Sequence, residues 1–583
     1  MTTDNQILQI IELKKNGMNH RQISKEVFGK SSSASTVHSV LNKHFYNQKE
    51  QVNKMKQQAV QVADELNEII RLSKEGLTNA EISEVVGRSP TSIGKFLNRK
   101  THVEFWESYD EKPISGGTKI SPTDRKKLVG KRFVFTSAQN NTNIHKEFFE
   151  ALKLFCADKG AELIVGTFNY NKTGFQNGPS EDTWFDPAIR NYILNESRTI
   201  SNDMVWCGEL SILPTAANPV SGFHSYTQSS GGIIPHVKVQ LEPLPRANGK
   251  CVRQLFTTGA ITQQNYVPQK AGQQAGFHHV FGATYVEVDD DGHSFVRQLI
   301  AESETGCFYD LDKYYTPKAI TNGHAIEAIN YGDVHGSKVD EVVAEISWGD
   351  NKHSILNTLK PKHQFLHDVF DMSYRNHHNI KDPYFMYKMH VNGTESVKSE
   401  VTNTAALMAS MIRPFSKLVV VESNHDLALE KWLKEQDYRY DPVNALFFLE
   451  MQTVTYQHMA RNEEFHIFEH ACRLVNPKLH QAQFLRTDES FVICGDIECG
   501  AHGHNGNNGA RGSIRAFQML GTRYNTGHTH SAAIKDGVYI AGVSGKLQMG
   551  YNKGGSSWSQ SHILTYPNGK RTIITIKNGK WHA

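Results

Sequence analysis

Apolar residues recur at helical spacing in two stretches of the first hundred residues, and the two stretches repeat one another. Residues 10–17 (IIELKKNG) match residues 69–76 (IIRLSKEG) at an offset of 59, and Ile23 matches Ile82 at the same offset. A third apolar stretch, around Val37 and Ile93, matches at an offset of 56. Each copy therefore predicts three short helices with a glycine turn before the third.

The repeat resembles the helix-turn-helix of small DNA-binding modules, and we place one module at 1–50 and a second at 51–106. Residues 1–100 carry 15 Lys and Arg against 10 Asp and Glu, an excess that suits a phosphate backbone. A helical bundle for oligomerisation or protein docking is the alternative. The candidate DNA contacts are the exposed polar residues expected on the third helices: Lys43, Lys95, Asn98 and Arg99.

A strand–helix–strand pattern follows a Pro- and Gly-containing linker at 107–131. Residues 133–136 (FVFT) and 163–165 (LIV) predict strands, and Ile144, Phe148, Leu152 and Phe155 give the apolar face of a helix between them. We therefore expect an α/β domain over 132–323. It shows no catalytic pattern, and a scaffold or substrate-positioning role is favoured.

Composition narrows the class of protein. With 38% hydrophobic and 21% charged residues, the chain can build sizeable cores, and a disordered chain is excluded. Seven cysteines without a CxxC pair indicate reduced thiols, and neither a secretory signal nor a membrane-length apolar run is recognised. We expect a cytoplasmic protein. Of the 29 histidines, 19 lie in 324–583, which points to a metal site with nitrogen and oxygen ligands.

The same region contains five places where an apolar run ends in metal-binding residue types. The first is 325–331, followed by Gly-Asp333-Val-His335-Gly, where glycines permit a tight turn around an ion. Any one of these segments alone is weak evidence, but the ordered set is strong. The other four segments are 365–371 (FLHDVFD), 417–426 (KLVVVESNHD), 491–504 with His502 and His504, and 527–530 (GHTH).

This ordered set resembles the calcineurin-like metallophosphoesterase family over roughly 325–583. The resemblance implies a β-sandwich flanked by helices and two divalent ions bridged by Asp368. His425 would lie beside the scissile phosphate and assist the leaving group. The implied metal ligands are Asp333, His335, Asp368 and His530 for the first ion, and Asp368, Asn424, His502 and His528 for the second, with His504 as an alternative to His502.

The chemistry explains the residue types. Two ions about 3.5–4 Å apart lower the pKa of a bridging water, so that a hydroxide can attack the phosphate. Mixed carboxylate and imidazole ligands favour Mn²⁺, with Zn²⁺, Fe or Mg²⁺ as alternatives. The sequence departs from the family at His367 and Ser423, where glycine is usual, and a helical insertion is expected at about 428–488.

Three residues are candidates for holding substrate. Arg511 and Arg515 flank a glycine-rich segment before a short predicted helix at 513–520, and would suit a phosphodiester. A mobile surface loop is an equally good interpretation of that segment. His378 lies in an Asn-His-His run after the second motif, and a structural role is favoured for it.

The predicted fold class is thus multidomain α/β: tandem helix-turn-helix repeats, a middle α/β domain and a C-terminal metallophosphoesterase sandwich at 324–583. DNA-binding-like modules beside a phosphoesterase site favour a deoxyribonuclease, with DNA as partner, a homo-oligomeric state and no membrane. The arrangement also resembles host-DNA-degrading proteins of T5-like bacteriophages, around residues 132–150, 333–378 and 495–530. The alternatives are a nucleotide phosphodiesterase and a DNA-binding regulator with a degenerate phosphoesterase fold.

Overall fold

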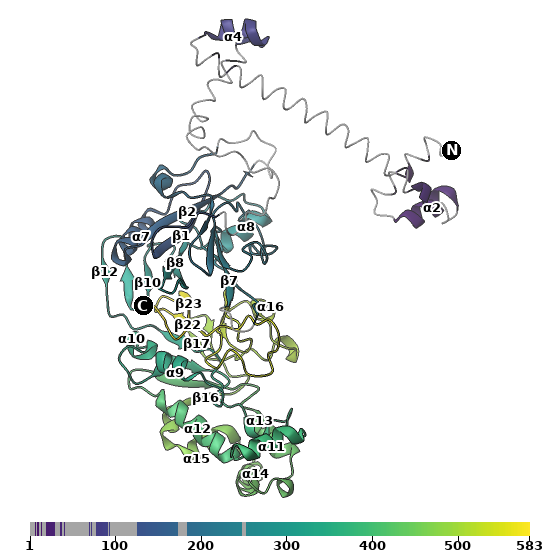
Figure 1. Ribbon diagram of the computed structural model, residues 1–583, viewed down its shortest axis with the longest axis vertical. Helices are drawn as coiled ribbons and strands as arrows, with labels where there is room; N and C mark the ends of the chain where they lie inside the picture. The colour runs from purple at the N-terminus through teal and green to yellow at the C-terminus, as the bar shows by residue number, and fades with distance from the viewer. Residues whose placement is uncertain are drawn as a thin grey trace. The chain divides into compact units, whose positions relative to one another are not determined.

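The computed structural model divides the chain into two compact units, Met1–Thr118 and Lys119–Ala583 (Figure 1). In the larger unit, it describes residues 125–172, 183–247 and 252–582. In the smaller unit, the described residues are 6, 9, 10, 13, 19–29, 35–37, 40, 69, 72, 77–90 and 93.

The described residues of the smaller unit form two equivalent apolar clusters. Helix α2 (His20–Phe28) starts at a capping box on Asn19, and α4 (Asn79–Val86) starts at one on Thr78. Both helices end at a glycine with positive φ, as the repeat predicts. The buried residues of the clusters occupy matching positions of the repeat: Ile10, Ile23 and Val37 in the first, and Ile69, Leu72, Ile82 and Ile93 in the second.

The predicted strand–helix–strand unit opens the larger unit. Strands β1 (Arg132–Gln139) and β2 (Glu162–Phe168) are parallel, and α7 (Lys146–Lys159) connects them. Strands β8 (Gly282–Val288) and β9 (Ser294–Ile300) complete a four-stranded sheet in the order β2-β1-β8-β9. Nearby elements are α8 (Lys270–Phe277), η5 (Pro187–Tyr192) and a small sheet of β10 (Phe308–Asp310), β11 (Lys313–Tyr315) and β12 (Ile320–Thr321).

A ten-stranded sheet combines segments from both sides of the boundary expected at 323 and 324. Strand β20 (Ala533–Lys535) pairs with β6 (Leu241–Leu244) through Ile534 and Leu241. The middle region and the C-terminal region therefore form one compact unit. The sheet order is β17 (Val492–Ile493), β18 (Ile497–Glu498), β19 (Arg523–Thr526), β21 (Val538–Ile540), β20, β6, β7 (Arg253–Thr257), β5 (Gly231–Ile234), β4 (Met204–Cys207) and β3 (Ser197–Thr199).

A six-stranded sheet packs against one end of the ten-stranded sheet and carries the predicted motifs. Alternate residues of its strand β15 (Lys417–Val421) are buried in two different hydrophobic cores. Val419 and Val421 contact Ile493 and Ile497 of the other sheet, whereas Leu418 and Val420 face the helices. The sheet order is β16 (Gln483–Leu485), β15, β14 (His363–Leu366), β13 (Ala328–Asn330), β22 (Ser561–Thr565) and β23 (Arg571–Thr575).

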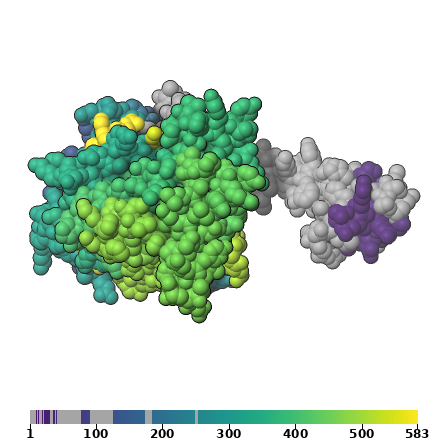
Figure 2. Space-filling view, turned by 90° about the horizontal axis from the view of Figure 1, so that it is seen from below, coloured from purple at the N-terminus to yellow at the C-terminus, as the bar shows by residue number. Residues whose placement is uncertain are grey.

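Helices cover the outer face of the six-stranded sheet, so the expected mixed α/β architecture is confirmed. The predicted insertion is helical from α13 to η8, but its last residues form β16 instead, because they pair with β15. Figure 2 shows the green segment around residues 380–475 covering much of one end of the unit. The helices are α9 (Glu341–Trp348), α10 (Ile355–Leu359), η6 (Ser373–Arg375), α11 (Pro383–Val391), α12 (Val397–Ser410), α13 (Ala428–Glu435), η7 (Tyr438–Tyr440), α14 (Ala445–Ala460), α15 (Ile467–Val475) and η8 (Pro477–Gln481).

Two further expectations concern cysteines and membranes. The cysteines that the structure describes, all except Cys251, are free thiols, in line with the expected absence of disulfides. Among the described helices, none has both the length and the apolar character that a membrane span requires.

Candidate metal centre

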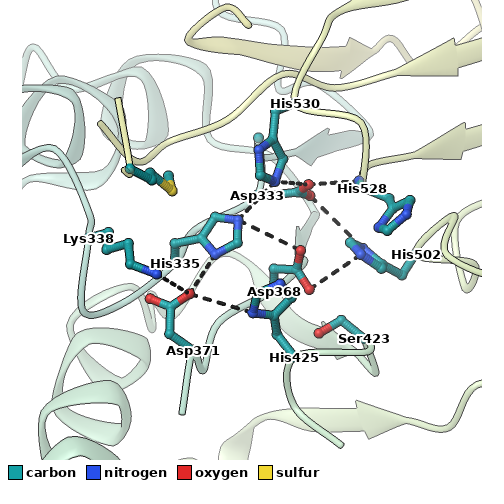
Figure 3. Close-up of polar contacts among 12 residues, drawn as sticks. Asp333, His335, Lys338, Asp368, Asp371, Ser423, His425, His502, His528 and His530 are labelled. Carbon is teal, nitrogen blue, oxygen red and sulfur yellow. Dashed lines mark hydrogen bonds and ion pairs between the residues drawn. The ribbon is translucent and has the colours of Figure 1, made fainter. Parts of the chain in front are cut away.

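The predicted ligands lie at one edge of the six-stranded sheet. Strands β13, β14 and β15 are parallel, so the loops after them meet at the same edge. Asp333 and His335 follow β13, Asp368 follows β14, and His425 follows β15. The loop after β19 adds His528 and His530, and Figure 3 shows all these side chains converging.

The first cluster consists of Asp333, His335, Asp368 and His530, which are all buried, with ligand atoms within 4.8 Å of one another. The Nε2 atoms of His335 and His530 lie 2.9 Å apart, and His530 Nε2 lies 3.2 Å from Asp333 Oδ2. Two imidazole nitrogens facing each other need a proton between them unless a cation binds both. These four residues are the ones predicted for the first ion.

The second cluster consists of Asp368, His502 and His528. Oδ1 of Asp368 lies 3.3 Å from Nε2 of His502, whereas Oδ2 of Asp368 lies 3.7 Å from Nε2 of His335. The two oxygens of one carboxylate thus face two different groups of imidazoles. This is the arrangement that a carboxylate shared by two ions requires.

Backbone hydrogen bonds fix the loops that carry these ligands. His335 N donates to Asp368 O at 2.7 Å, and His528 N donates to Asp333 Oδ2 at 2.7 Å. A Cβ at Gly527 would collide with the Asp333 carboxylate, so only glycine fits before His528. His335, Asp368, His528 and His530 have positive φ, a costly conformation for non-glycine residues that accumulates at functional sites.

Several buried polar atoms of the cluster lack a hydrogen-bond partner. They include Oδ1 of Asp333, Oδ1 of Asp368 and both ring nitrogens of His502. Burying such groups unpaired is costly, and coordination to a cation would satisfy them. The donor set of carboxylates and imidazoles fits divalent transition ions, so these residues are suited to hold metal.

The charges in the cluster are strongly coupled. Burial opposes the charged form of His502, but Asp368 and Asp333 more than offset it and raise the pKa of His502 to about 9. Burial likewise opposes ionisation of Asp368, yet His502 and His425 bring its pKa well below the ordinary value. Burial and the neighbouring His502 lower the pKa of His528 to about 4.

A third group joins His335 to Asp371 and His425, and Asp371 is the functional residue that the sequence analysis missed. His335 Nδ1 and Asp371 Oδ1 are 2.6 Å apart, and His425 Nδ1 lies 3.7 Å from the same oxygen. The side chain of His425 is 25% exposed, so it can reach a substrate. The sequence shows an acidic residue three residues after Asp368, but it does not indicate which side chain this residue would contact.

A second overlooked carboxylate, Asp426, connects two of the loops. It accepts hydrogen bonds from Phe370 N and from the backbone N and Oγ of Ser423. It therefore holds the loop of His425 against the loop of Asp368. The departure from glycine at Ser423 has a physical reason, because the serine hydroxyl donates to Asp426 at 2.8 Å.

The structure gives less support to the remaining predicted ligands. Asn424 is exposed in the turn beside His425, and its role as a ligand stays a prediction. His504 lies outside the second cluster, with its ring centroid 5.4 Å from that of His502, so His502 is the better ligand. His367, the other departure from the family pattern, is fully buried next to His502, and neither of its ring nitrogens has a hydrogen-bond partner.

The three predicted substrate contacts do not belong to the metal clusters. Arg511, Arg515 and His378 are exposed, and the ring of His378 lies against that of His377 at 3.8 Å. Helix α16 (Ile514–Gln518) is shorter than the predicted 513–520, and Ser513 caps its first turn. The four DNA-binding candidates, Lys43, Lys95, Asn98 and Arg99, lie outside the described residues.

The fold and the site define a mixed α/β protein with buried Asp and His groups that could hold metal ions. The chain is 44% identical over 486 residues to Protein A1 of Escherichia phage T5, a match that covers 81% of this chain and 87% of that protein. The chain therefore belongs to the family of Protein A1, and the expected relation to T5-like phages is confirmed. No protein-family model and no solved structure matches the chain.

Proposed function

We propose that the protein is a metal-dependent phosphodiesterase that hydrolyses DNA. The observation that carries the proposal is Asp368, whose two oxygens face His335 on one side and His502 on the other. A shared carboxylate between two imidazole groups is the arrangement of a two-ion phosphoesterase centre. The motif resemblance to the calcineurin-like metallophosphoesterase family supports the same chemistry.

Each part of the cluster has a role in this reaction. Two bound divalent ions would lower the pKa of a water molecule and neutralise the phosphate oxygens. Asp333, His335, Asp368 and His530 would hold one ion, and Asp368, Asn424, His502 and His528 the other, with Mn²⁺ preferred. His425, partly exposed beside His335, would donate a proton or hydrogen bond to the leaving oxygen.

DNA is the proposed substrate because of the N-terminal repeat. Its two capped helices and matching apolar clusters agree with small helical modules, and the first hundred residues carry a positive excess. Relation to a phage protein agrees with a role in degrading host DNA inside the infected cell. A homo-oligomeric state remains part of the proposal.

The test compares substrates and metals with the full-length protein. Supercoiled plasmid, linear duplex, single-stranded DNA and bis(p-nitrophenyl) phosphate are incubated with Mn²⁺, Mg²⁺ or Zn²⁺, with and without EDTA. We expect Mn²⁺-dependent DNA hydrolysis that stops on chelation and is lost in Asp333→Ala. DNA hydrolysis that survives EDTA would contradict the metal centre, and cleavage of only the small diester would favour a nucleotide phosphodiesterase.

A further inference from the structure

A cavity of about 380 Å³ lies beside the metal cluster and has no part in the metal chemistry. Its walls combine apolar side chains with polar residues, which are Asp340, Ser559, Gln560, Thr575, Lys577 and Asn578. A concave space with apolar walls and a set of fixed polar groups is typical of a small-molecule site. The apolar side chains that line it are Val252, Val342, Val343, Leu547, Trp558 and Ile576.

Strand register places this cavity at the same edge of the six-stranded sheet as the metal cluster. Asn330, at the end of β13 just before Asp333, pairs with Ile563 of β22. Ser561, two residues before Ile563 along β22, pairs with Thr575, which lines the cavity. The cavity is therefore at the same edge as the loop that carries Asp333, two strands away from β13.

Direct contacts join the cavity wall to the first ligand group. The ring of Trp558 packs edge-on against the ring of His530, with centroids 4.2 Å apart, and Ser559 N donates to His530 O at 3.0 Å. Both residues line the cavity. A ligand there would lie on the other side of one aromatic ring from a metal ligand.

A chain of side-chain contacts links the cavity to the metal cluster. Tyr551 lies 5.7 Å from Trp558 between ring centroids, and Lys338 Nζ lies 5.5 Å from the Tyr551 ring. The same Lys338 Nζ is 3.8 Å from Asp371 Oδ1. A cation and two aromatic rings thus run from the metal cluster to the cavity.

We propose that this cavity receives a nucleobase of the DNA strand whose phosphate lies at the metal centre; the proposal rests on the proposed function. A nucleobase is a flat heteroaromatic ring that packs on Trp558 and apolar walls and offers a polar edge to the carboxamide of Gln560, which Asp340 and Gly545 O hold in place through its Nε2. A base in the cavity cannot remain stacked and paired in a duplex. The substrate at the moment of cleavage is therefore an unpaired strand.

The test compares ligands with and without a base. Binding of dAMP and of 2-deoxyribose 5-phosphate to the full-length protein with Mn²⁺ is measured by titration calorimetry. We expect dAMP to bind at least about tenfold more tightly, the order of one base–aromatic contact. Equal affinities for the two ligands would overturn the proposal.

A matched pair of variants links the base preference to this cavity. Val342 and Val443 are 55% and 54% exposed, so a larger side chain is tolerated at both, but only Val342 lines the cavity. Val342→Trp should abolish the preference for dAMP, whereas Val443→Trp should keep it. If Val342→Trp retains the preference, the base binds elsewhere and the proposal is wrong.

Hydrolysis assays test this proposal independently of the proposed function. Val342→Trp should raise KM for thymidine 5′-(p-nitrophenyl phosphate) by about tenfold, whereas Val443→Trp should leave this KM unchanged. A base preference without hydrolysis of any phosphodiester would contradict the proposed function alone. Hydrolysis without a base preference would contradict the cavity proposal alone.

Discussion

The Nδ1 atom of His335 lies 2.6 Å from Oδ1 of Asp371, and both side chains are fully buried. The ring N–H donates to the carboxylate, which leaves Nε2 free to bind a cation. Asp371 is itself held by the hydroxyl of Ser337 at 2.6 Å. The pair fixes both the tautomer and the orientation of this ligand.

Asp371→Asn should therefore weaken metal binding without removing a ligand. Loss of the negative charge behind His335 makes its Nε2 a poorer donor, and we expect a fall in Mn²⁺ affinity of about 10- to 100-fold. Titration calorimetry with Mn²⁺ measures the effect. Asp350→Asn, at a fully exposed aspartate, is the control, and unchanged affinity in Asp371→Asn would disprove the supporting role.

Metal stoichiometry distinguishes the two clusters. The wild-type protein should bind two ions, because two ligand groups share Asp368. His528→Ala removes a ligand of the second cluster only, so one ion should remain. At the same free metal concentration, Asp368→Ala should bind neither ion. Elemental analysis after gel filtration gives the count, and a single ion in the wild type would rule out the shared carboxylate.

His425→Ala should separate catalysis from metal binding. The residue belongs to neither of the two clusters that share Asp368, so the number of ions bound there should not change. Loss of a group that assists the leaving oxygen should lower kcat by about 10²- to 10⁴-fold. His353→Ala, at an exposed histidine, should leave kcat unchanged. Full activity in His425→Ala would remove this residue from the mechanism.

A buried ion pair outside the metal cluster, between Asp203 and Lys577, gives a pH-dependent contribution to stability. Burial opposes ionisation of Asp203, but Lys577, Ser294 and Ser201 offset it and lower the pKa to about 2. Because the pKa is depressed in the folded state, the carboxylate stabilises the fold above pH 4 by about 2 kcal/mol. That contribution is lost as the pH falls from about 4 to 2.

The variant Asp203→Asn tests this pH-dependent contribution, and the free energy of unfolding in urea is the quantity measured. The variant should be less stable than the wild type at pH 7, and the difference should shrink at pH 3. Asp290→Asn, at an exposed ion pair with Lys131, should have little effect at either pH. A stability difference for Asp203→Asn that does not depend on pH would contradict the assignment.

Deletion of residues 1–118 tests the contribution of the smaller unit to DNA binding. If its Lys and Arg residues contact phosphates, the truncated protein should bind duplex DNA more weakly. The dependence of log K on log salt should also flatten, by about 0.9 for each lost contact. Fluorescence anisotropy across a salt series measures both. An unchanged affinity and slope would favour the alternative role in assembly.

The metal centre was largely predictable because each ligand directly follows a strand. The strands β13, β14 and β15 each contain buried apolar residues just before the ligand loop, and the loops after parallel strands must meet at one edge. The roles of Asp371 and Asp426 were not predictable in this way. They act through hydrogen bonds to His335 and Ser423, which depend on how the loops fold against one another.

The fold was predictable where the pattern is local. The unit β1–α7–β2 follows from the spacing of Phe148, Leu152 and Phe155 between two apolar runs. The ten-stranded sheet does not follow from a local pattern, because β20 pairs with β6 from a distant part of the chain and both strands are short. Short strands carry too few alternating residues to specify their partners.

The pairing of β20 with β6 also limits where the protein could be divided. A fragment that begins near residue 324 would keep every proposed metal ligand, yet it would expose the backbone of β20 as an unpaired edge. It would also lose the aspartate that neutralises the buried Lys577. Such a fragment should aggregate, so a stable fragment that keeps the proposed metal ligands should also include Asp203 and β6.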